Sequence, residues 1–198
     1  MNWIKGRGFL AALLAVVAVP AFAQFSESYN FLKAVRERDG AKVQTIVANP
    51  SSTAINARDT RSGEGALHML VRGRDYSWLI FLLGNGARPD IQDDEGNTPL
   101  IMAAQIGWVE GAEQLLARRA NVNLPNGRGE TPLILAVQRR DIAMVRLLLR
   151  QGADPNRTDS LAGYSALDYA RRDSRAVPIL RLLEAPRTTP QRSYGPGR

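Results

Sequence analysis

The sequence contains no cysteine and only one histidine, His68, among its 198 residues. Without cysteine there can be no disulfide bond, thiolate metal site, cysteine nucleophile or lipidated N-terminal cysteine. One histidine cannot supply a histidine pair for a metal ion or a relay between two histidines. Because groups suited to catalysis are this scarce, we expect a protein that is not an enzyme and needs no cofactor. We assign no catalytic, cofactor-binding or metal-binding residue.

A concentrated positive surface is also missing, although the formal net charge is +7. Five basic residues lie at the two ends of the chain: Lys5, Arg7, Arg187, Arg192 and Arg198. They leave only +2 for residues 24–185. A surface that binds nucleic acid needs many side chains that neutralise phosphates. We therefore expect no nucleic acid among the partners.

Long apolar stretches are absent except for one near the start of the chain, at residues 9–19. A positively charged segment precedes it, and Ala21 and Ala23 are small residues where a signal peptidase requires them. We expect a signal peptide at residues 1–23, cleaved after Ala23. An uncleaved anchor is the alternative, but residues 9–23 fall short of the ~20 that a membrane-spanning helix needs. No second such stretch follows, so we expect no stable membrane insertion after cleavage.

The most informative pattern is an internal repeat whose period is the distance from Thr98 to Thr131. The motif Thr98-Pro99-Leu100-Ile101 recurs one period later as Thr131-Pro132-Leu133-Ile134. Related motifs begin at Gly65, one period before the first, and at Ser165, one period and one extra position after the second. A weaker copy around residues 34–39 matches residues 136–141. The chain therefore contains five units.

Each unit has the sequence features of two short helices and a loop. Thr98 and Thr131 suit the N-cap position, and the proline after each suits the first helical position, whose N–H has no partner in the helix. Apolar residues then recur at helical spacing. Gly86 and Gly152 stand where a helix ends and a positive φ is wanted. These signals predict helical hairpins that stack side by side.

In these motifs the chain resembles the ankyrin repeat family, whose units carry Gly-x-Thr-Pro-Leu-His, then Ala-Ala, Leu-Leu and Gly-Ala. The resemblance covers about residues 28–185 and implies an all-α ankyrin-repeat solenoid of about five helix-turn-helix units. It also implies that His68 is a structural hydrogen-bonding residue. We place the repeat domain at residues 24–185 and a flexible, disordered basic tail at residues 186–198. The expected units are residues 28–58, 59–92, 93–125, 126–158 and 159–185.

Arginines recur where the first helix of a unit ends, and stacking would align them along one edge as an arginine ladder. One interpretation is a surface for an anionic partner, such as an acidic protein or the phosphates of the envelope. The other is structural, because cations stabilise helix C-termini and each group is followed by an aspartate placed to cap the second helix. The residues are Arg36, Arg38, Arg72, Arg74, Arg139, Arg140, Arg171 and Arg172, with Asp39, Asp75, Asp141 and Asp173.

Two groups of aromatic and apolar residues need an assignment. Trp108 stands at the start of the second helix of the third unit. Aromatic residues of this kind are enriched at binding hot spots, but packing under a neighbouring loop is an equal alternative. Trp78, Ile80 and Phe81 follow helical spacing, so we expect them in the core.

The resemblance also implies protein–protein interaction, because ankyrin arrays bind other proteins through a concave face made of loop tips and first helices. Carried over by position, the expected partner-binding surface is Arg61, Glu64, Arg72, Asp94, Glu95, Asn97, Gln105, Ile106, Trp108, Arg128, Glu130, Gln138 and Arg139. The core does not dictate the residues at such positions, so they do not identify the partner.

The signal peptide points to the periplasm of a Gram-negative bacterium. There we expect a monomeric scaffold that binds another protein, as an adaptor or a protector of an envelope protein. Two alternatives stay open from the sequence. The protein is secreted as an effector that binds a host protein, or it binds anionic envelope surfaces through the arginine ladder.

Overall fold

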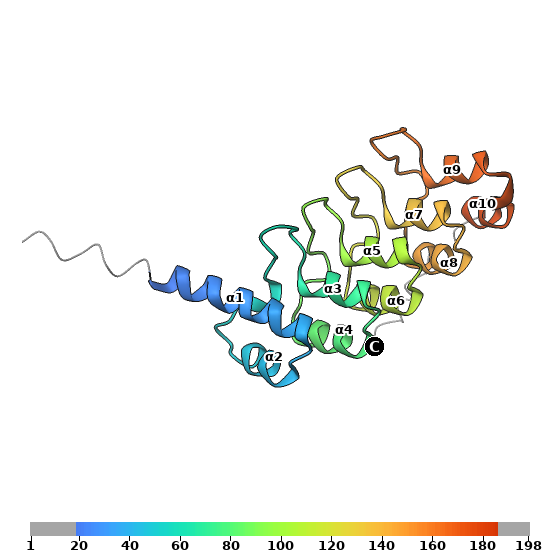
Figure 1. Cartoon of the computed structure of the whole chain (residues 1–198). Coiled ribbons are helices and arrows are strands. Elements are labelled where there is room, and N and C mark those ends of the chain that lie inside the picture. The colour runs from blue at the N-terminus through green and yellow to red at the C-terminus, as the bar shows by residue number, and fades with distance from the viewer. Residues whose placement is uncertain (1–18, 186–198) are drawn as a thin grey trace, which may run out of the picture.

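The structure is a computed structural model that describes residues 19–185, and its helices form five consecutive hairpins, here called units 1 to 5 (Figure 1). The first helices of these units, α1, α3, α5, α7 and α9, are Val19–Glu37, Ala66–Arg72, Pro99–Ile106, Pro132–Gln138 and Ala166–Arg172. The second helices, α2, α4, α6, α8 and α10, are Gly40–Val47, Tyr76–Gly84, Val109–Ala117, Ile142–Arg150 and Val177–Glu184. Two short 3-10 helices are η1, Ala54–Asn56, and η2, Ser174–Ala176.

The units stack side by side into an elongated array. The first helices form one layer, the second helices form another, and the loops before α3, α5, α7 and α9 project to one side (Figure 1). Each first helix contacts the first helix of the next unit, and α4, α6, α8 and α10 contact one another in the same order. The described residues contain no strand longer than an isolated bridge. The predicted all-α solenoid of five helix-turn-helix units is confirmed.

The sequence explains where the helices begin. Thr98 Oγ1 accepts a hydrogen bond from the Ile101 N–H at 3.1 Å, and Thr131 Oγ1 caps α7 in the same way. Among the second helices, Asp141 Oδ1 accepts from the Met144 N–H at 3.0 Å. Such caps satisfy N–H groups that the first turn of a helix leaves without a partner. The N-cap prediction is confirmed for Asp39, Asp75 and Asp141, while Asp173 caps η2.

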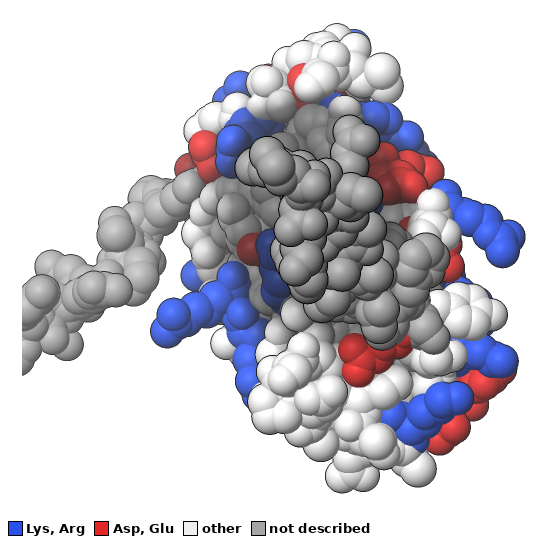
Figure 2. Space-filling view, turned by 90° about the vertical axis from the view of Figure 1, so that its left-hand side faces the viewer, with Lys and Arg blue, Asp and Glu red and all other residues white. Residues whose placement is uncertain are grey.

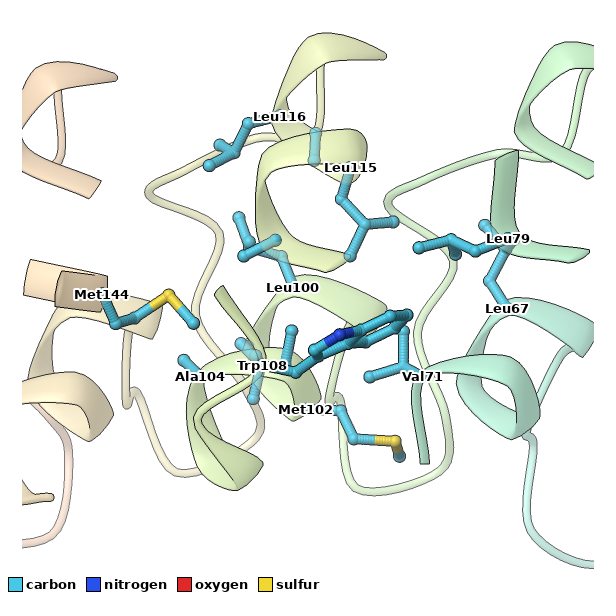
Figure 3. Packing of buried hydrophobic residues seen from close by; sticks show 14 of the residues in the cluster. Leu67, Val71, Leu79, Leu100, Met102, Ala104, Trp108, Leu115, Leu116 and Met144 are labelled. Atoms are coloured by element: carbon cyan, nitrogen blue, oxygen red, sulfur yellow. The ribbon is translucent and has the colours of Figure 1, made fainter. Parts of the chain in front are cut away.

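One continuous apolar cluster runs through the array and joins its units. Leu67, Leu100 and Leu133, which stand at equivalent positions of α3, α5 and α7, are at most 2% exposed. Leu167 is the equivalent residue of unit 5 and is only half-buried, because no later described unit covers it. Figure 3 shows side chains from units 2, 3 and 4 meeting in this cluster. Each hairpin therefore depends on its neighbours to bury its apolar faces.

The prediction that Phe81 belongs to the core is wrong. Phe81 is 37% exposed, while Trp78 and Ile80 are half-buried and Trp78 packs against the core cluster. The physical reason lies in the composition of α4, which carries no charged residue between Tyr76 and Gly84. A helix that is apolar on all sides gives no sequence signal for the side that faces water.

The predicted ends of the chain lie largely outside the described residues. Residues 1–18 of the signal peptide and the predicted tail at residues 186–198 are not among them. Helix α1 begins at Val19, so cleavage after Ala23 would remove its first residues. Among the described helices, none is long and apolar enough to cross a membrane.

Candidate partner-binding face

Four loops precede α3, α5, α7 and α9, and each is fixed by one polar side chain. In the loop of unit 3, Asp93 Oδ1 accepts hydrogen bonds from the N–H groups of Glu95 at 3.0 Å and Asn97 at 2.7 Å. Side chains of this type hold a turn by bonding to the backbone two to four residues further on. The side chains that do the same in the other loops are Asp59, Asn126 and Asp159.

Neighbouring loops are joined by one backbone hydrogen bond at each step. The N–H donors and carbonyl acceptors are Asp94 to Ser62 at 3.0 Å, Gly127 to Glu95 at 2.9 Å, and Ser160 to Arg128 at 2.9 Å. The approach is close, because a Cβ atom on Gly96 would lie 2.6 Å from the backbone nitrogen of Gly127. Together with the exposed sides of the first helices, these loops form a continuous surface, which we call the loop face.

His68 links units 2 and 3 beneath this surface. Its Nδ1 accepts a hydrogen bond from the Gly65 N–H at 3.0 Å, which leaves the proton on Nε2 to be donated to the Asn97 carbonyl at 2.9 Å. The ring is fully buried, and this burial lowers the pKa of His68 below its ordinary value. A neutral ring satisfies both contacts, so the expected structural role of His68 is confirmed.

Most of the residues expected at the partner-binding surface are accessible. Seven are exposed: Arg61, Arg72, Asp94, Glu95, Arg128, Gln138 and Arg139. Four are half-buried: Glu64, Gln105, Ile106 and Glu130. Two are buried: Asn97 and Trp108.

The placement of Asn97 on the accessible surface is wrong, since this residue is 5% exposed. Its Nδ2 donates to Asp93 Oδ2 at 3.2 Å, and its Oδ1 accepts from Asn126 Nδ2, in the next loop, at 3.3 Å. These contacts give Asn97 a role in holding the loops of units 3 and 4 together. A contact with a partner would require them to open.

For Trp108 the structure decides between the two alternatives in favour of packing. The side chain is 5% exposed and belongs to the core cluster, where Figure 3 shows its ring beside Val71 of unit 2. It also lies over Gly111, where a Cβ atom would be 2.1 Å from the indole ring. Trp108 stands where α2, α4 and α8 carry a capping aspartate and offers α6 no side-chain cap. Its place in the partner-binding surface is therefore wrong.

Most of the arginine ladder is paired within the molecule. Arg38 Nη1 lies 2.5 Å from Asp75 Oδ2, an oxygen that receives no hydrogen bond and is compensated by this ion pair. Arg74 donates to the carbonyl of Ile106 in unit 3 at 2.7 Å. The other ion pairs are Arg36–Asp59, Arg72–Glu64, Arg140–Asp173 and Arg171–Glu184. These contacts support the structural interpretation, because the neutralising acids are already in place.

The charges on the accessible surface are mixed. Figure 2 faces the α1 end of the array, and Lys and Arg side chains there stand beside Asp and Glu side chains. A hollow of about 300 Å³ between the ends of α1 and α3 has Val35, Met69 and Leu70 in its lining, together with arginines of the ladder. In the described part of the chain, no group of three or more acidic, histidine or cysteine side chains is arranged to hold a metal ion.

Sequence reasoning missed an aromatic cluster on the loop face of unit 5. The guanidinium carbon of Arg172 lies 4.5 Å from the ring centroid of Tyr164, which meets Tyr169 edge to face with centroids 5.6 Å apart. The Tyr169 hydroxyl donates to Asp159 Oδ2 at 2.5 Å. Burial opposes ionisation of Asp159, but this bond and three backbone N–H groups outweigh it and lower its pKa. A comparison of the residues before the N-caps of α3, α5, α7 and α9 would have shown that only unit 5 has a tyrosine there, Tyr164.

Hairpins that recur at a constant period, a shared apolar seam and projecting loops define a helical-repeat binding scaffold. A family model described as ankyrin repeats (3 copies) matches residues 67–159. The chain is 35% identical over 143 residues to an ankyrin repeat-containing protein of Treponema pallidum (strain Nichols). The match covers 72% of this chain and 47% of the relative, so the chain spans about half the length of that relative. The chain belongs to the ankyrin-repeat family, whose members are typically non-enzymatic scaffolds that bind other proteins.

Proposed function

We propose that this protein is a periplasmic adaptor or protector that holds a protein of the Gram-negative envelope against its loop face. The observation that supports binding is the loop face, whose loops are joined by backbone hydrogen bonds. The leader-like layout of residues 1–23 supports export, and the lack of cysteine is compatible with an oxidising compartment.

The loop face binds by offering a surface that is already in its bound shape. Backbone hydrogen bonds join the loops, and His68 ties the start of α3 to the loop of unit 3. Because the loops are fixed before the encounter, little conformational entropy is lost on association. Exposed side chains at the loop tips, such as Arg61, Asp94 and Arg128, then set which partner is accepted.

Site-specific photo-crosslinking in cells tests the binding face. A photoreactive phenylalanine analogue replaces Gln138, which is exposed at the end of α7 on the loop face. The matched control carries it in place of Arg146, which is exposed on the second helix of the same unit. We expect one partner band with the Gln138 variant and none with the control. Crosslinks only from Arg146 would contradict the use of the loop face.

Export is tested separately by fractionating cells that express the full chain. We expect the protein in the periplasmic fraction, with a mass that corresponds to a mature chain beginning at Gln24. Recovery of the mature chain mainly from the medium would favour the secreted-effector alternative. Recovery of uncleaved chain in the membrane fraction would favour an anchor.

The anionic-surface alternative concerns the basic side chains that remain available. In the described part of the chain, Arg139 and Arg172 are the ladder arginines whose side chains form neither an ion pair nor a hydrogen bond. Reversing both to Glu removes these charges without breaking an internal ion pair. If the wild-type chain sediments with acidic liposomes and the double variant does so equally, the ladder is not the binding surface.

A further inference from the structure

In units 2 and 5, the residue before the N-cap of the first helix contacts a residue in the last turn of that helix. In unit 2 they are Glu64 and Arg72, which form an ion pair. The same positions hold Asn97 and Gln105 in unit 3, and Glu130 and Gln138 in unit 4. In unit 5 they are Tyr164 and Arg172. Unit 5 thus keeps the arginine of unit 2 but replaces its acidic partner with a neutral ring.

This replacement leaves Arg172 without an ion pair among the described residues. Its guanidinium stacks 4.5 Å above the Tyr164 ring, and the side chain is exposed. Asp168, one turn earlier on α9, uses its Oδ2 to accept hydrogen bonds from the N–H and hydroxyl of Ser165. These bonds, ahead of the Arg171 and Arg172 charges, lower the pKa of Asp168.

We propose that Arg172 and Tyr164 form a recognition site for a carboxylate side chain of the partner, flanked by an apolar residue that packs on Tyr164 and Tyr169. The site rests on the proposed function, because it specifies the kind of protein segment that the loop face accepts. The partner's carboxylate pairs with Arg172 in the way that the carboxylate of Glu64 pairs with Arg72 within unit 2.

Stacking prepares Arg172 for this contact. A guanidinium lying over an aromatic ring keeps its N–H groups pointing outward in its own plane, free for a bidentate contact with a carboxylate. Tyr164 is itself held by Tyr169, whose hydroxyl is fixed by Asp159. The arginine therefore loses little side-chain freedom when the partner arrives. Tyrosine and arginine are also the residue types that dominate binding hot spots.

The test uses two arrays of synthetic nonapeptides, one with a central Glu and the other with a central Gln, in which the flanking positions mix Leu, Tyr, Ala, Ser and Pro. The purified full chain is labelled and its binding to both arrays is measured. We expect about tenfold tighter binding to the Glu array, as a charge-assisted hydrogen bond provides. Arg172→Gln is expected to remove this preference. Arg171→Gln, which removes the same charge from the neighbouring residue, is the matched control and keeps it.

Two further variants separate recognition from folding. Tyr164→Glu rebuilds the internal ion pair that unit 2 already contains, so it is expected to fold normally and lose the preference for Glu. Tyr164→Phe keeps the stacking and is expected to keep the preference. Equal binding to both arrays, binding to neither, or an unchanged preference in Arg172→Gln would overturn the proposal. The photo-crosslinking at Gln138 does not depend on this result, so the adaptor proposal and the carboxylate site fail independently.

Discussion

Single residues in the loops differ in how closely the next unit approaches them. Gly96 and Gly163 stand at equivalent positions and both adopt a positive φ, of 78° and 68°. The neighbouring loop lies against Gly96, whereas nothing lies within 4 Å of the Cβ position of Gly163. The two glycines share a backbone requirement, but only Gly96 also meets a packing requirement.

Alanine substitution separates these two effects. Gly163→Ala only places a Cβ atom on a backbone that is already left-handed, and it is expected to lower the free energy of unfolding by about 1–2 kcal/mol. Gly96→Ala adds a clash with the backbone of Gly127 and is expected to lower it by roughly 1–3 kcal/mol more. Urea denaturation followed by circular dichroism measures both. Equal losses would show that the loops do not pack as described.

We expect His68 to make the free energy of unfolding depend on pH. Burial lowers its pKa in the folded chain below the ordinary value of 6.5, so the unfolded chain binds more protons. The free energy of unfolding is therefore expected to fall as the pH drops through 6.5 toward the lowered folded value. His68→Ile places there the residue type that Ile101 and Ile134 provide, and it is expected to flatten this dependence between pH 7 and 5. An unchanged slope in urea denaturation of this variant would assign the dependence to other groups.

At the scale of helices, the units differ in the residue that follows the first helix. Arg38, Arg74 and Arg140 follow their first helices with φ of 58°, 49° and 58°, where unit 3 has Gly107. A left-handed backbone at a residue with a side chain costs roughly 1–2 kcal/mol. All three arginines contact the following unit, and these contacts offset part of that cost.

The capping aspartates give a prediction for the second helices. Asp141→Ala removes the acceptor for the Met144 N–H and is expected to reduce the free energy of unfolding by about 0.5–2 kcal/mol. Asp141→Asn keeps an oxygen at this position and is expected to lose much less. Thermal and urea unfolding of both variants measure the difference. If both variants lose the same amount, the carboxylate acts through its charge and not through the cap.

The helices could be predicted from the sequence because period, caps and apolar spacing agree in units 3 and 4. The candidate surface was less predictable. Equivalent positions of the repeat share a backbone location, but their side chains need not have the same direction or exposure. Asn97 bonds to the neighbouring loop, and Trp108 packs into the core cluster from the N-cap position of α6. The exposure of Phe81 could not be predicted, because α4 contains no charged residue to mark the side that faces water. The pair of Tyr164 and Arg172 was readable from the sequence once their unit 2 counterparts were compared.

At the scale of the whole molecule, unit 5 has a polar residue where the other units are apolar. Val35, Val71, Ala104 and Val137 stand at equivalent positions and are at most 3% exposed. Unit 5 carries Arg171 at this position, exposed and paired with Glu184 at 3.1 Å. A repeat array needs such polar residues on the outer face of a terminal unit to stay soluble.

This polar face supports the expectation of a monomer. Arg171→Val extends the apolar seam toward solvent beside the half-buried Leu167 and is expected to cause concentration-dependent self-association. Sedimentation velocity at increasing concentration compares the variant with the wild-type chain, which is expected to remain monomeric. A variant that also stays monomeric would show that Arg171 does not protect the end of the array.

The central claim is that a rigid loop face, and not the outer layer of second helices, binds a partner protein. Hydrogen–deuterium exchange of the chain, alone and in a complex purified with its crosslinked partner, tests it most directly. The account predicts slower exchange on binding in the loops at residues 58–64, 93–97, 126–130 and 159–164, with α4, α6 and α8 unchanged. Protection confined to α4, α6 or α8 would contradict it.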